Sequence, residues 1–422
     1  MIDIKLLRED PKFIIDAAKA KNVEVDIDRI LELDRKVKAL KSEIESIAAQ
    51  KNEASGSIAS AEKDEKKKLI DDMTAISKKE EELKASLSPL SEELDELLFK
   101  IPNPSASDVT VAVSEDENEV IRTVGEPTKF KFTPKDHIEL GKLLDIIDTE
   151  SASKASASRF VYLKGDAVML QFALMQYALQ TAMKHGFVPV VVPHLINAKA
   201  MRAMGYLEHG GHDEIYYLAK DNMYLIGTSE QALGPMHIDK TIDASELPLR
   251  YIGYSPCYRR EAGSYGKDTK GIIRLHQFDK MEMFSVTKPE NSDAEHELIL
   301  SIEEELMQGL GIPYQVLKMV SGDLGLPAAR KYDIEAWVPS QEKYRETHSC
   351  STTTDFQARR LNTKFKEGKE KPQFVHMLNG TAFAIGRTIV AILENFQQED
   401  GSVIIPEVLR PFMGKDVMTP KA

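Results

Sequence analysis

Residues 258–282 read YRREAGSYGKDTKGIIRLHQFDKME. Three glycines separate one strand-like run from the next, so this stretch predicts two antiparallel strands joined by a loop. Side chains two residues apart on a strand share a face, which would place Arg259 beside Glu261 and Phe278 beside Glu282. A guanidinium binds a phosphate through two donors, an acid beside it accepts from an adenine amine, and a phenyl ring offers a base a flat face. Taken alone, the pattern is equally that of a surface hairpin with alternating charges.

Strand-like runs also surround this hairpin. From about residue 135 they read GFVPVVVP, NMYLIG, RYIGYSP, YQVLKMV, YDIEAWVP and FVHML. Helical patterns intervene at about 166–185, 293–309, 353–366 and 381–398. A parallel βαβ repetition is not evident, and strands come in adjacent pairs. The sequence therefore predicts an α+β fold with an antiparallel sheet flanked by helices.

The first hundred residues follow a different pattern. Apolar residues recur at steps of three and four, first in residues 30–47 and again in residues 73–97. This is a heptad stripe, and it predicts an antiparallel helical hairpin over residues 27–100. The serine-rich stretch 54–60, with Gly56, is expected to be the turn. Pro89 predicts a bend in the second helix, because proline cannot donate its backbone hydrogen bond.

The ends of this hairpin are also predicted. IPNPSASD at residues 101–108 should stop the second helix, because it places two prolines there. Residues 2–20 predict one short helix, and residues 108–130 an acidic connector with short strands. These patterns divide the chain into an N-terminal domain, 1–107, and a second domain, 108–422.

The composition of the chain excludes several classes of protein. The chain has 422 residues and a formal charge of −13, so a generally basic nucleic-acid coat is excluded. Its two cysteines, Cys257 and Cys350, argue against a disulfide scaffold and suit a reducing cytosol. The N-terminus is charged too early for a signal peptide, and no run of 18 apolar residues predicts a membrane helix. A cytoplasmic location is expected.

The usual phosphate and metal signatures do not occur. There is no G-x-x-x-x-G-K-[ST], no G-x-G-x-x-G that opens a helix and no H-E-x-x-H. Two further segments carry polar groups in apolar surroundings, LIGTSE at residues 225–230 and FVHMLNGTAFAIGR at residues 374–387. The first is equally a helix cap, and Arg387 in the second is equally a side chain that reaches the surface.

Together these segments resemble the class II aminoacyl-tRNA synthetases, and within them the seryl-tRNA synthetases. The three class motifs correspond to residues of about 166–193, 256–284 and 374–398. The seryl marks are the REAGS and HQF strings, YRET followed by SC and DFQARR, and IIPEVLRPFMG near the end. The chain departs from the usual pattern at Thr347-His348, where Val-Ser is common, and at Thr381-Ala382, where Ser-Gly is common.

The resemblance implies an ATP-dependent serine–tRNA ligase and assigns roles to particular residues. Catalysis would depend on Arg259, Glu261 and Arg387. ATP would be bound by Arg259, Arg260, Glu261, Phe278, Glu346, Thr347, His348, Ser349 and Arg387. Serine would be bound by Thr228, Ser229, Glu230, Arg259, Glu282, Asn379 and Thr381. Mg²⁺ would be held by Glu346 and Ser349, since oxygen ligands suit this ion.

The resemblance also implies partners: tRNA(Ser) on the helical arm, selenocysteine tRNA where that tRNA exists, and a second copy of the chain through motif 1. Basic residues on the arm are Arg35, Lys36, Lys38, Lys41, Lys51, Lys63, Lys66, Lys67, Lys68, Lys78 and Lys79. They are equally the solvated face of a coiled coil with paired charges. Two other functions stay open. One is a synthetase paralogue that loads a small amino acid onto a carrier protein, and the other is a non-catalytic binding protein on the same fold.

Overall fold

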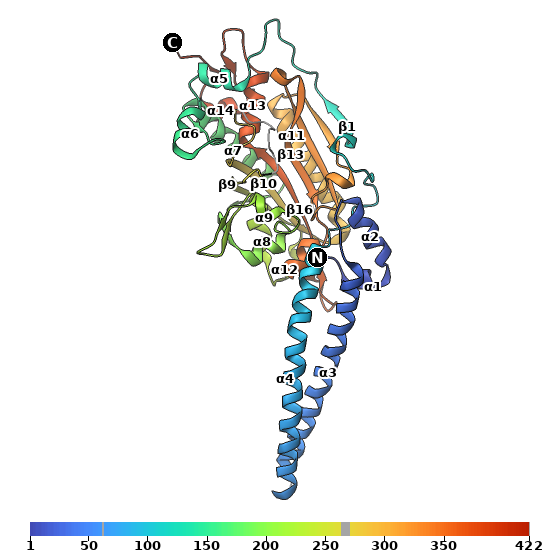
Figure 1. The fold of residues 1–422 in the computed structure, drawn as a ribbon. Helices are drawn as coiled ribbons and strands as arrows, with labels where there is room; N and C mark the ends of the chain where they lie inside the picture. Colours follow the sequence, from blue (N-terminus) through green and yellow to red (C-terminus); the bar gives the residue numbers. More distant parts are fainter. Residues whose placement is uncertain (61–62, 263–270, 422) are drawn as a thin grey trace. The chain divides into compact units, whose positions relative to one another are not determined.

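The computed structural model describes residues 1–60, 63–262 and 271–421 (Figure 1). The chain forms two compact units, Met1–Pro102 and Asn103–Ala422. Within the described residues, every helix is too short or too polar to cross a lipid bilayer.

The first unit is helical throughout. It contains α1 (Ile4–Glu9), α2 (Pro11–Ala20), α3 (Ile27–Ser60) and α4 (Lys63–Lys100). The single helix predicted for residues 2–20 is wrong, because Asp10 caps a new helix that begins at Pro11. An Asp side chain before a proline satisfies free N–H groups at a helix start, and proline at the first position has no N–H to satisfy.

Helices α3 and α4 form the predicted antiparallel hairpin (Figure 1). Their contact is made by the heptad stripe, with Ile30, Leu33 and Val37 of α3 packed in one cluster with Leu94 and Leu98 of α4. The turn predicted at residues 54–60 is wrong, because α3 continues through Ser60. The connection therefore falls at residues 61–62, outside the described residues. Helix α4 also continues through Pro89, and a bend there stays a prediction.

The second unit is built on an eight-stranded sheet. Its order is β1 (Glu119–Val124), β11 (Tyr314–Lys318), β12 (Arg330–Val338), β13 (Lys343–Thr352), β16 (His376–Ala384), β10 (Gln277–Thr287), β9 (Leu249–Tyr258) and β4 (Val188–Val191). All neighbours are antiparallel except β4 and β9. The predicted antiparallel α+β fold is confirmed, and the connector contributes an edge strand.

Helices cover this sheet and bury its apolar side chains. The larger core includes α7 (Asp166–Lys184), α11 (Ser292–Leu310) and α13 (Ile385–Asn395), and the smaller core includes α8 (Ala198–Met204), α10 (Glu230–Leu233) and α12 (Phe356–Leu361). The other helices are α5 (His137–Leu143), α6 (Thr149–Ser156), α9 (Gly211–Glu214) and α14 (Arg410–Met413). Small sheets are formed by β2 (Ile147–Asp148), β3 (Tyr162–Leu163), β5 (Leu195–Asn197), β6 (Tyr217–Leu218), β7 (Met223–Leu225), β8 (Thr241–Asp243), β14 (Lys364–Lys366), β15 (Gln373–Phe374), β17 (Val403–Ile404) and β18 (Val417–Met418).

Two of the four helices predicted in this unit are placed correctly, and two are not. The predictions for 166–185 and 293–309 match α7 and α11. The helix predicted at 353–366 ends at Leu361, because Asn362 adopts a left-handed backbone with φ +54° and β14 follows. The helix predicted from residue 381 begins at Ile385, because the preceding residues complete β16.

Two central strands each carry a bulge. In β13, Ile334 pairs with His348 but Glu335 pairs with Glu346, so Thr347 is an extra residue. In β16, Met281 pairs with Phe383 but Glu282 pairs with Thr381, so Ala382 is extra. An inserted residue reverses the alternation of faces beyond it. The bulges therefore decide which side chains of β13 and β16 share a face.

Candidate functional site

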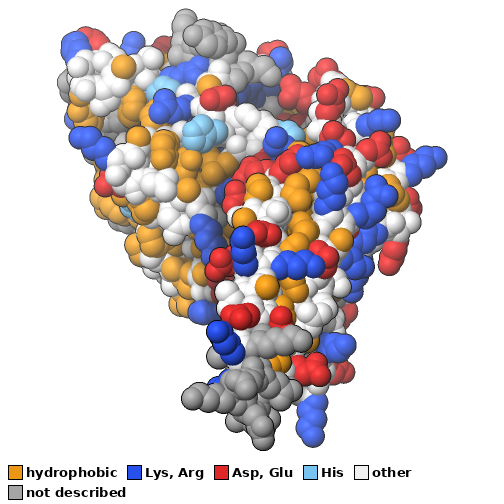
Figure 2. Space-filling view, turned by 60° about the horizontal axis from the view of Figure 1, so that its bottom comes forward, with side chains coloured by type: hydrophobic (Ala, Val, Ile, Leu, Met, Phe, Trp, Pro, Cys, Tyr) orange, Lys and Arg blue, Asp and Glu red, His pale blue; other side chains and the backbone are white. Residues whose placement is uncertain are grey.

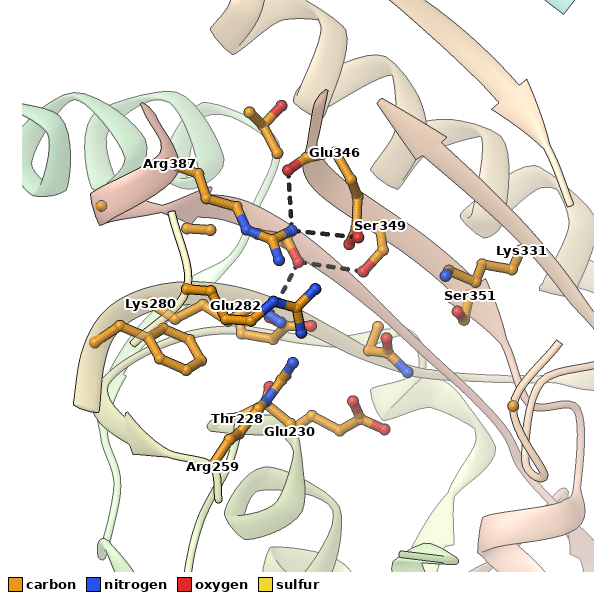
Figure 3. Close-up of a pocket in the computed structure, with 18 of the residues that line it drawn as sticks. Thr228, Glu230, Arg259, Lys280, Glu282, Lys331, Glu346, Ser349, Ser351 and Arg387 are labelled. Atoms are coloured by element: carbon orange, nitrogen blue, oxygen red, sulfur yellow. Dashed lines mark hydrogen bonds and ion pairs between the residues drawn. The ribbon is translucent and has the colours of Figure 1, made fainter. Parts of the chain in front are cut away.

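One pocket of about 390 Å³ gathers most of the predicted site residues (Figure 3). They come from three strands, β10, β13 and β16, and from the segments that follow β7, β9 and β16, although they are far apart in sequence. The predicted residues that line this pocket are Thr228, Glu230, Arg259, Glu261, Phe278, Glu282, Glu346, Thr347, Ser349, Asn379, Thr381 and Arg387.

Arg259 and Phe278 are neighbours in this pocket. The Arg259 guanidinium carbon lies 5.3 Å from the centre of the Phe278 ring, and its Nε donates to the carbonyl of Gly227 at 3.2 Å. Arg259 directly follows the end of β9, so the strand fixes its backbone while its side chain stays free to point into the pocket (Figure 3). A planar cation beside an aromatic ring can hold a phosphate and the base of one nucleotide.

Glu261 reaches the same pocket by a different route from the one predicted. Strand β9 ends at Tyr258, and Glu261 has a left-handed backbone with φ +53°, so the alternation of a strand does not apply to Arg259 and Glu261. The chain turns instead, and the Glu261 Oε2 pairs with Nη1 of Arg274 at 2.5 Å. Phe278 and Glu282 do lie on one strand and line one pocket, as their spacing predicted.

Arg387 and Glu346 are in contact with one another on the wall of the pocket (Figure 3). Nη1 of Arg387 lies 3.2 Å from Oε2 of Glu346 and donates to the Glu346 carbonyl at 2.9 Å. Desolvation opposes ionisation of Glu346, yet the cations Arg387 and Lys331 outweigh it and lower the pKa of this carboxyl. Glu346 is therefore a carboxylate at neutral pH, and it lies beside a cation suited to a phosphate.

Glu346 and Ser349 share the pocket because of the bulge at Thr347. Three residues apart on a regular strand, their side chains would lie on opposite faces. Asp333 pairs with Ser349 across the β12–β13 ladder, and its buried Oδ1 has no hydrogen-bond partner among the described residues. Carboxylate and hydroxyl oxygens are ligands that Mg²⁺ prefers, so these residues fit a bound Mg²⁺ ion.

The opposite wall of the pocket carries a buried carboxyl, Glu230. It is only 4% exposed, and Oε1 accepts from the Gln357 amide at 3.1 Å. Burial and then the nearby Glu282 raise the pKa of Glu230 to about 7, although Gln357 and Tyr206 oppose the shift. The Thr228 hydroxyl beside it is buried and has no partner within the described parts of the chain. This pair offers an acceptor and an unused hydroxyl to a small cationic group.

Glu282 forms the floor of this end of the pocket. It is 1% exposed and pairs with Lys280 on the same strand. The Thr381 hydroxyl lies 3.5 Å from Glu282 Oε2 and 3.4 Å from the Ser349 hydroxyl. Asn379, two residues before Thr381, lines the same wall. Together Glu282, Thr381 and Asn379 can bind the hydroxyl group of a small ligand in a confined part of the pocket.

Three predicted site residues do not line the pocket. Arg260 lies over the Tyr216 ring at 4.7 Å and donates to the Ile215 carbonyl. Ser229 is buried and donates to the Gly253 carbonyl at 3.3 Å. His348 is buried on the other face of β13, where it contacts Thr347 and Phe383, because it directly precedes Ser349 and adjacent residues of a strand point to opposite faces. The structure gives these three residues packing contacts in place of the predicted ligand contacts.

Several lining residues were missed from the sequence, namely Tyr206, Arg274, Lys280, Lys331 and Ser351. Strand alternation could have found Lys280, which lies two residues from Glu282 on β10 and is buried. Lys331 pairs with Asp333 at 3.0 Å and lies at one end of the pocket with Ser351 (Figure 3). Tyr206 has no comparable signal, because it comes from a loop that no short pattern places near the sheet.

Comparisons with known proteins agree with this geometry. Residues 1–104 match the Seryl-tRNA synthetase N-terminal domain, and residues 216–396 match the tRNA synthetase class II core domain (G, H, P, S and T). A serine–tRNA ligase of Thermobifida fusca is 44% identical over 424 residues, which cover 100% of both chains.

Solved structures show the same likeness over the whole length. Seryl-tRNA synthetase from Pyrococcus horikoshii, crystallised with ATP, is 37% identical with a TM-score of 0.90, and the match covers 100% of both chains. A cytoplasmic serine–tRNA ligase from Naegleria fowleri, in complex with AMP, is 35% identical with a TM-score of 0.86, covering 100% of this chain and 99% of that one. On its sequence, its fold and its pocket, the chain belongs to the seryl-tRNA synthetase family of class II aminoacyl-tRNA synthetases.

Proposed function

We propose that this chain is an ATP-dependent serine–tRNA ligase. The observation that carries the proposal is the single pocket that joins Arg259, Phe278 and Arg387 to the buried acids Glu230 and Glu282. The first three residues can bind a nucleoside triphosphate, and the two acids can bind a small amino acid through its ammonium and hydroxyl groups. One cavity therefore places both substrates in contact. Relatives crystallised with ATP and AMP support this assignment.

The first step joins serine to the nucleotide. The serine carboxylate attacks the α-phosphorus, the bond to the bridging oxygen breaks, and pyrophosphate leaves with seryl-adenylate formed. Arg259 holds the α-phosphate and the serine carboxylate, Glu261 and Phe278 hold adenine, and Arg387 neutralises the leaving phosphates. These groups catalyse by position and charge, so no side-chain nucleophile is required.

Glu346 and Ser349 would hold Mg²⁺ beside the nucleotide, where the ion would supply positive charge that neutralises the phosphates. Glu346 is suited to this role because its neighbouring cations keep it ionised. Thr347, the bulged residue between the two ligands, keeps both on the pocket face and borders the nucleotide.

Selection of serine depends on the second half of the pocket. Glu230 and Thr228 bind the ammonium, and Glu282 binds the hydroxyl, with Thr381 and Asn379 limiting the space around it. A site built to bind a hydroxyl rejects alanine by roughly 10⁴ or more, because its buried polar groups would be left unpaired. Threonine is excluded by the lack of space for its additional methyl group.

The second step transfers serine to tRNA(Ser), whose terminal adenosine hydroxyl attacks the mixed anhydride and releases AMP. We assign the arm, α3 and α4, to this partner, because its exposed basic residues Lys36, Lys38 and Lys41 can contact a tRNA backbone. Selenocysteine tRNA is a second substrate where it exists. A cytoplasmic location follows from this activity.

A second copy of the chain is the other expected partner. Large apolar side chains of motif 1 are exposed in one copy, on α7 and on the edge strand β4. They are Met169 (45% exposed), Phe172 (55%), Met183 (54%), Val188 (56%) and Val191 (79%). Covering them favours a homodimer. Sedimentation equilibrium tests this, since a monomer at micromolar concentration contradicts it.

Pyrophosphate exchange into ATP, measured in turn with serine, threonine, alanine and glycine, tests the proposed function. We expect exchange with serine that exceeds exchange with the others by orders of magnitude. Aminoacylation of purified tRNA then separates a ligase from a carrier-loading paralogue, which would form adenylate without charging tRNA. The complete arm favours the ligase. A non-catalytic binding protein would show no exchange at all.

A further inference from the structure

Helix α11 carries three successive glutamates with different surroundings. Glu304 pairs with Arg122 at 2.6 Å, and Glu305 pairs with His185 at 2.8 Å. Glu303 is fully buried, and neither of its carboxyl oxygens has a hydrogen-bond partner among the described residues. It occupies a core position of the helix between buried Ile299 and Leu306, where the packing pattern calls for an apolar residue.

This carboxyl lies directly behind the wall of the proposed serine pocket. A Cβ added to Gly380 would lie 2.8 Å from Glu303 Oε1 and 2.2 Å from a methyl of Ile299. Gly380 therefore directs its missing side chain at α11. Its neighbours on β16, Asn379 and Thr381, consequently direct theirs to the opposite face, where both line the pocket. One strand separates Glu303 from the pocket.

Glu303 is held in its neutral form. Burial raises its pKa well above the ordinary value, and Glu282 and Asp333 raise it further, while Lys280 and the backbone N–H of Thr381, which lies near the carboxyl without regular hydrogen-bond geometry, oppose the shift. An isolated buried carboxylate is costly, so the group keeps its proton at neutral pH. In its neutral form the Glu303 side chain still directs a carbonyl oxygen at Thr381, and it adds no further negative charge near Glu282.

We infer that the Glu303 carboxyl is a positioning residue for serine recognition, because it supports the Gly380–Thr381 segment from behind and so sets the Thr381 hydroxyl against Glu282. This inference rests on the proposed function, since it concerns the same pocket. Such support matters here because β16 pairs with β10 alone beyond the Cys350–Gly380 pair, and Ala382 is bulged in that remaining ladder. The carboxyl therefore acts where only one neighbouring strand fixes β16.

Two substitutions test this role. Glu303→Gln keeps the shape, the carbonyl oxygen and the neutral charge, so we expect the KM for serine to stay within about twofold of the wild type. Glu303→Leu fills the same space without the oxygen, so we expect that KM to rise roughly tenfold while the KM for ATP stays within about twofold. Glu305→Gln on the exposed side of the same helix is the matched control and should change neither constant.

Thermal melting completes the test. The desolvation cost of the Glu303 carboxyl outweighs its contact with the Thr381 backbone, and replacing a buried polar group by an apolar one of similar size is often neutral or stabilising, so Glu303→Leu should melt no lower than the wild type. If it does not fold, Glu303→Met takes its place, with the same expectation. A parallel rise of both KM values, or no change in either, would overturn the inference and leave Glu303 a core residue. A wild type without serine-dependent exchange would instead overturn the proposed function, and this inference with it.

Discussion

The arm and the pocket hold their charges in opposite environments. On the arm, Lys36 and Glu32 pair at 2.5 Å with 52% and 42% of their side chains exposed. In the pocket, Lys280 and Glu282 pair with 9% and 1% exposed. On the face that Figure 2 shows, lysine and arginine side chains alternate with aspartate and glutamate, as expected for charges in water.

Exposed and buried ion pairs therefore differ in how much their contribution to stability depends on the folded structure. An exposed ion pair contributes little to stability, because water solvates both partners equally well when they are apart. A buried pair costs desolvation energy that only a correctly formed site returns, so removing one partner leaves an expensive isolated charge. Substitutions on the arm should therefore affect binding of a partner, and substitutions in the pocket should affect chemistry and stability together.

The largest expected effect is that of Arg259→Ala. It removes the guanidinium that we place on the α-phosphate, so serine-dependent pyrophosphate exchange should fall by at least about 10³-fold. Circular dichroism and the melting temperature should stay unchanged, because the Arg259 side chain donates one hydrogen bond among the described residues, to the Gly227 carbonyl, and the backbone contacts of this residue with His276 remain in the variant. Exchange at the wild-type rate would contradict the assignment of the nucleotide to this pocket.

Shortening the arm should separate the two steps of the reaction. Deletion of residues 36–85, with a short glycine linker in their place, removes most of α3 and α4 and spares the second unit. We expect pyrophosphate exchange to remain and tRNA charging to fall about 100-fold, because the lost contacts are to the tRNA backbone. Charging at full rate would show that the arm has another purpose.

A pH-dependent effect on stability is expected at Glu230. Its pKa is raised to about 7 by burial, so the neutral form stabilises the fold below the ordinary pKa near 4.5, and that stability is lost as the pH rises through 7. Glu230→Gln does not titrate. Relative to this variant, the wild type should lose roughly 3 kcal/mol of unfolding free energy between pH 4.5 and pH 8.

Urea denaturation of both proteins at the two pH values measures this difference. The same measurement on Glu282→Gln, in the same pocket, shows how much of the loss of unfolding free energy is due to Glu230 alone. A constant difference between wild type and Glu230→Gln would mean that folding does not raise the pKa of Glu230, and the comparison between buried and exposed acids would fail at this residue.

The smallest expected effect is that of Lys36→Ala on the arm. Its pair with Glu32 is exposed, so the melting temperature should change by less than about 2 °C. Lys280→Ala is the matched control, because it leaves Glu282 buried without its cation and should cost about 3 kcal/mol or more. Equal shifts for the two lysines would remove the distinction between the two environments.

Much of the fold could be predicted because it follows from local periodicity. The heptad stripe through Ile30, Leu33 and Val37 predicts the hairpin, and paired strand-like runs predict the antiparallel sheet. The turn at residues 54–60 was wrong for a physical reason. Gly56 and the serines lower helix propensity only modestly, and a long two-helix contact overrides such local costs.

The site could be predicted only where its residues belong to recognisable segments. Arg259, Phe278 and Arg387 were found in this way. The shared face of Glu346 and Ser349 depends on a bulge, which depends on pairing with β12 and leaves no local signal. Contacts of this kind also explain why Lys331 was missed, since its place in the pocket depends on the pairing of β12 with β13. The face of His348 could have been predicted from strand alternation, because it directly precedes Ser349.

The bulges at Thr347 and Ala382 have a consequence for recombining this chain with its relatives. Each inserted residue decides which face of the sheet every later side chain of its strand points to. A recombination point within the strand therefore preserves the site only if both parent proteins carry the extra residue on the same side of that point. A chimera that lost one bulge would keep Glu346, Ser349, Asn379 and Thr381 in its sequence and still direct some of them away from the pocket. Alignment gaps in these two strands should therefore be treated as functional positions.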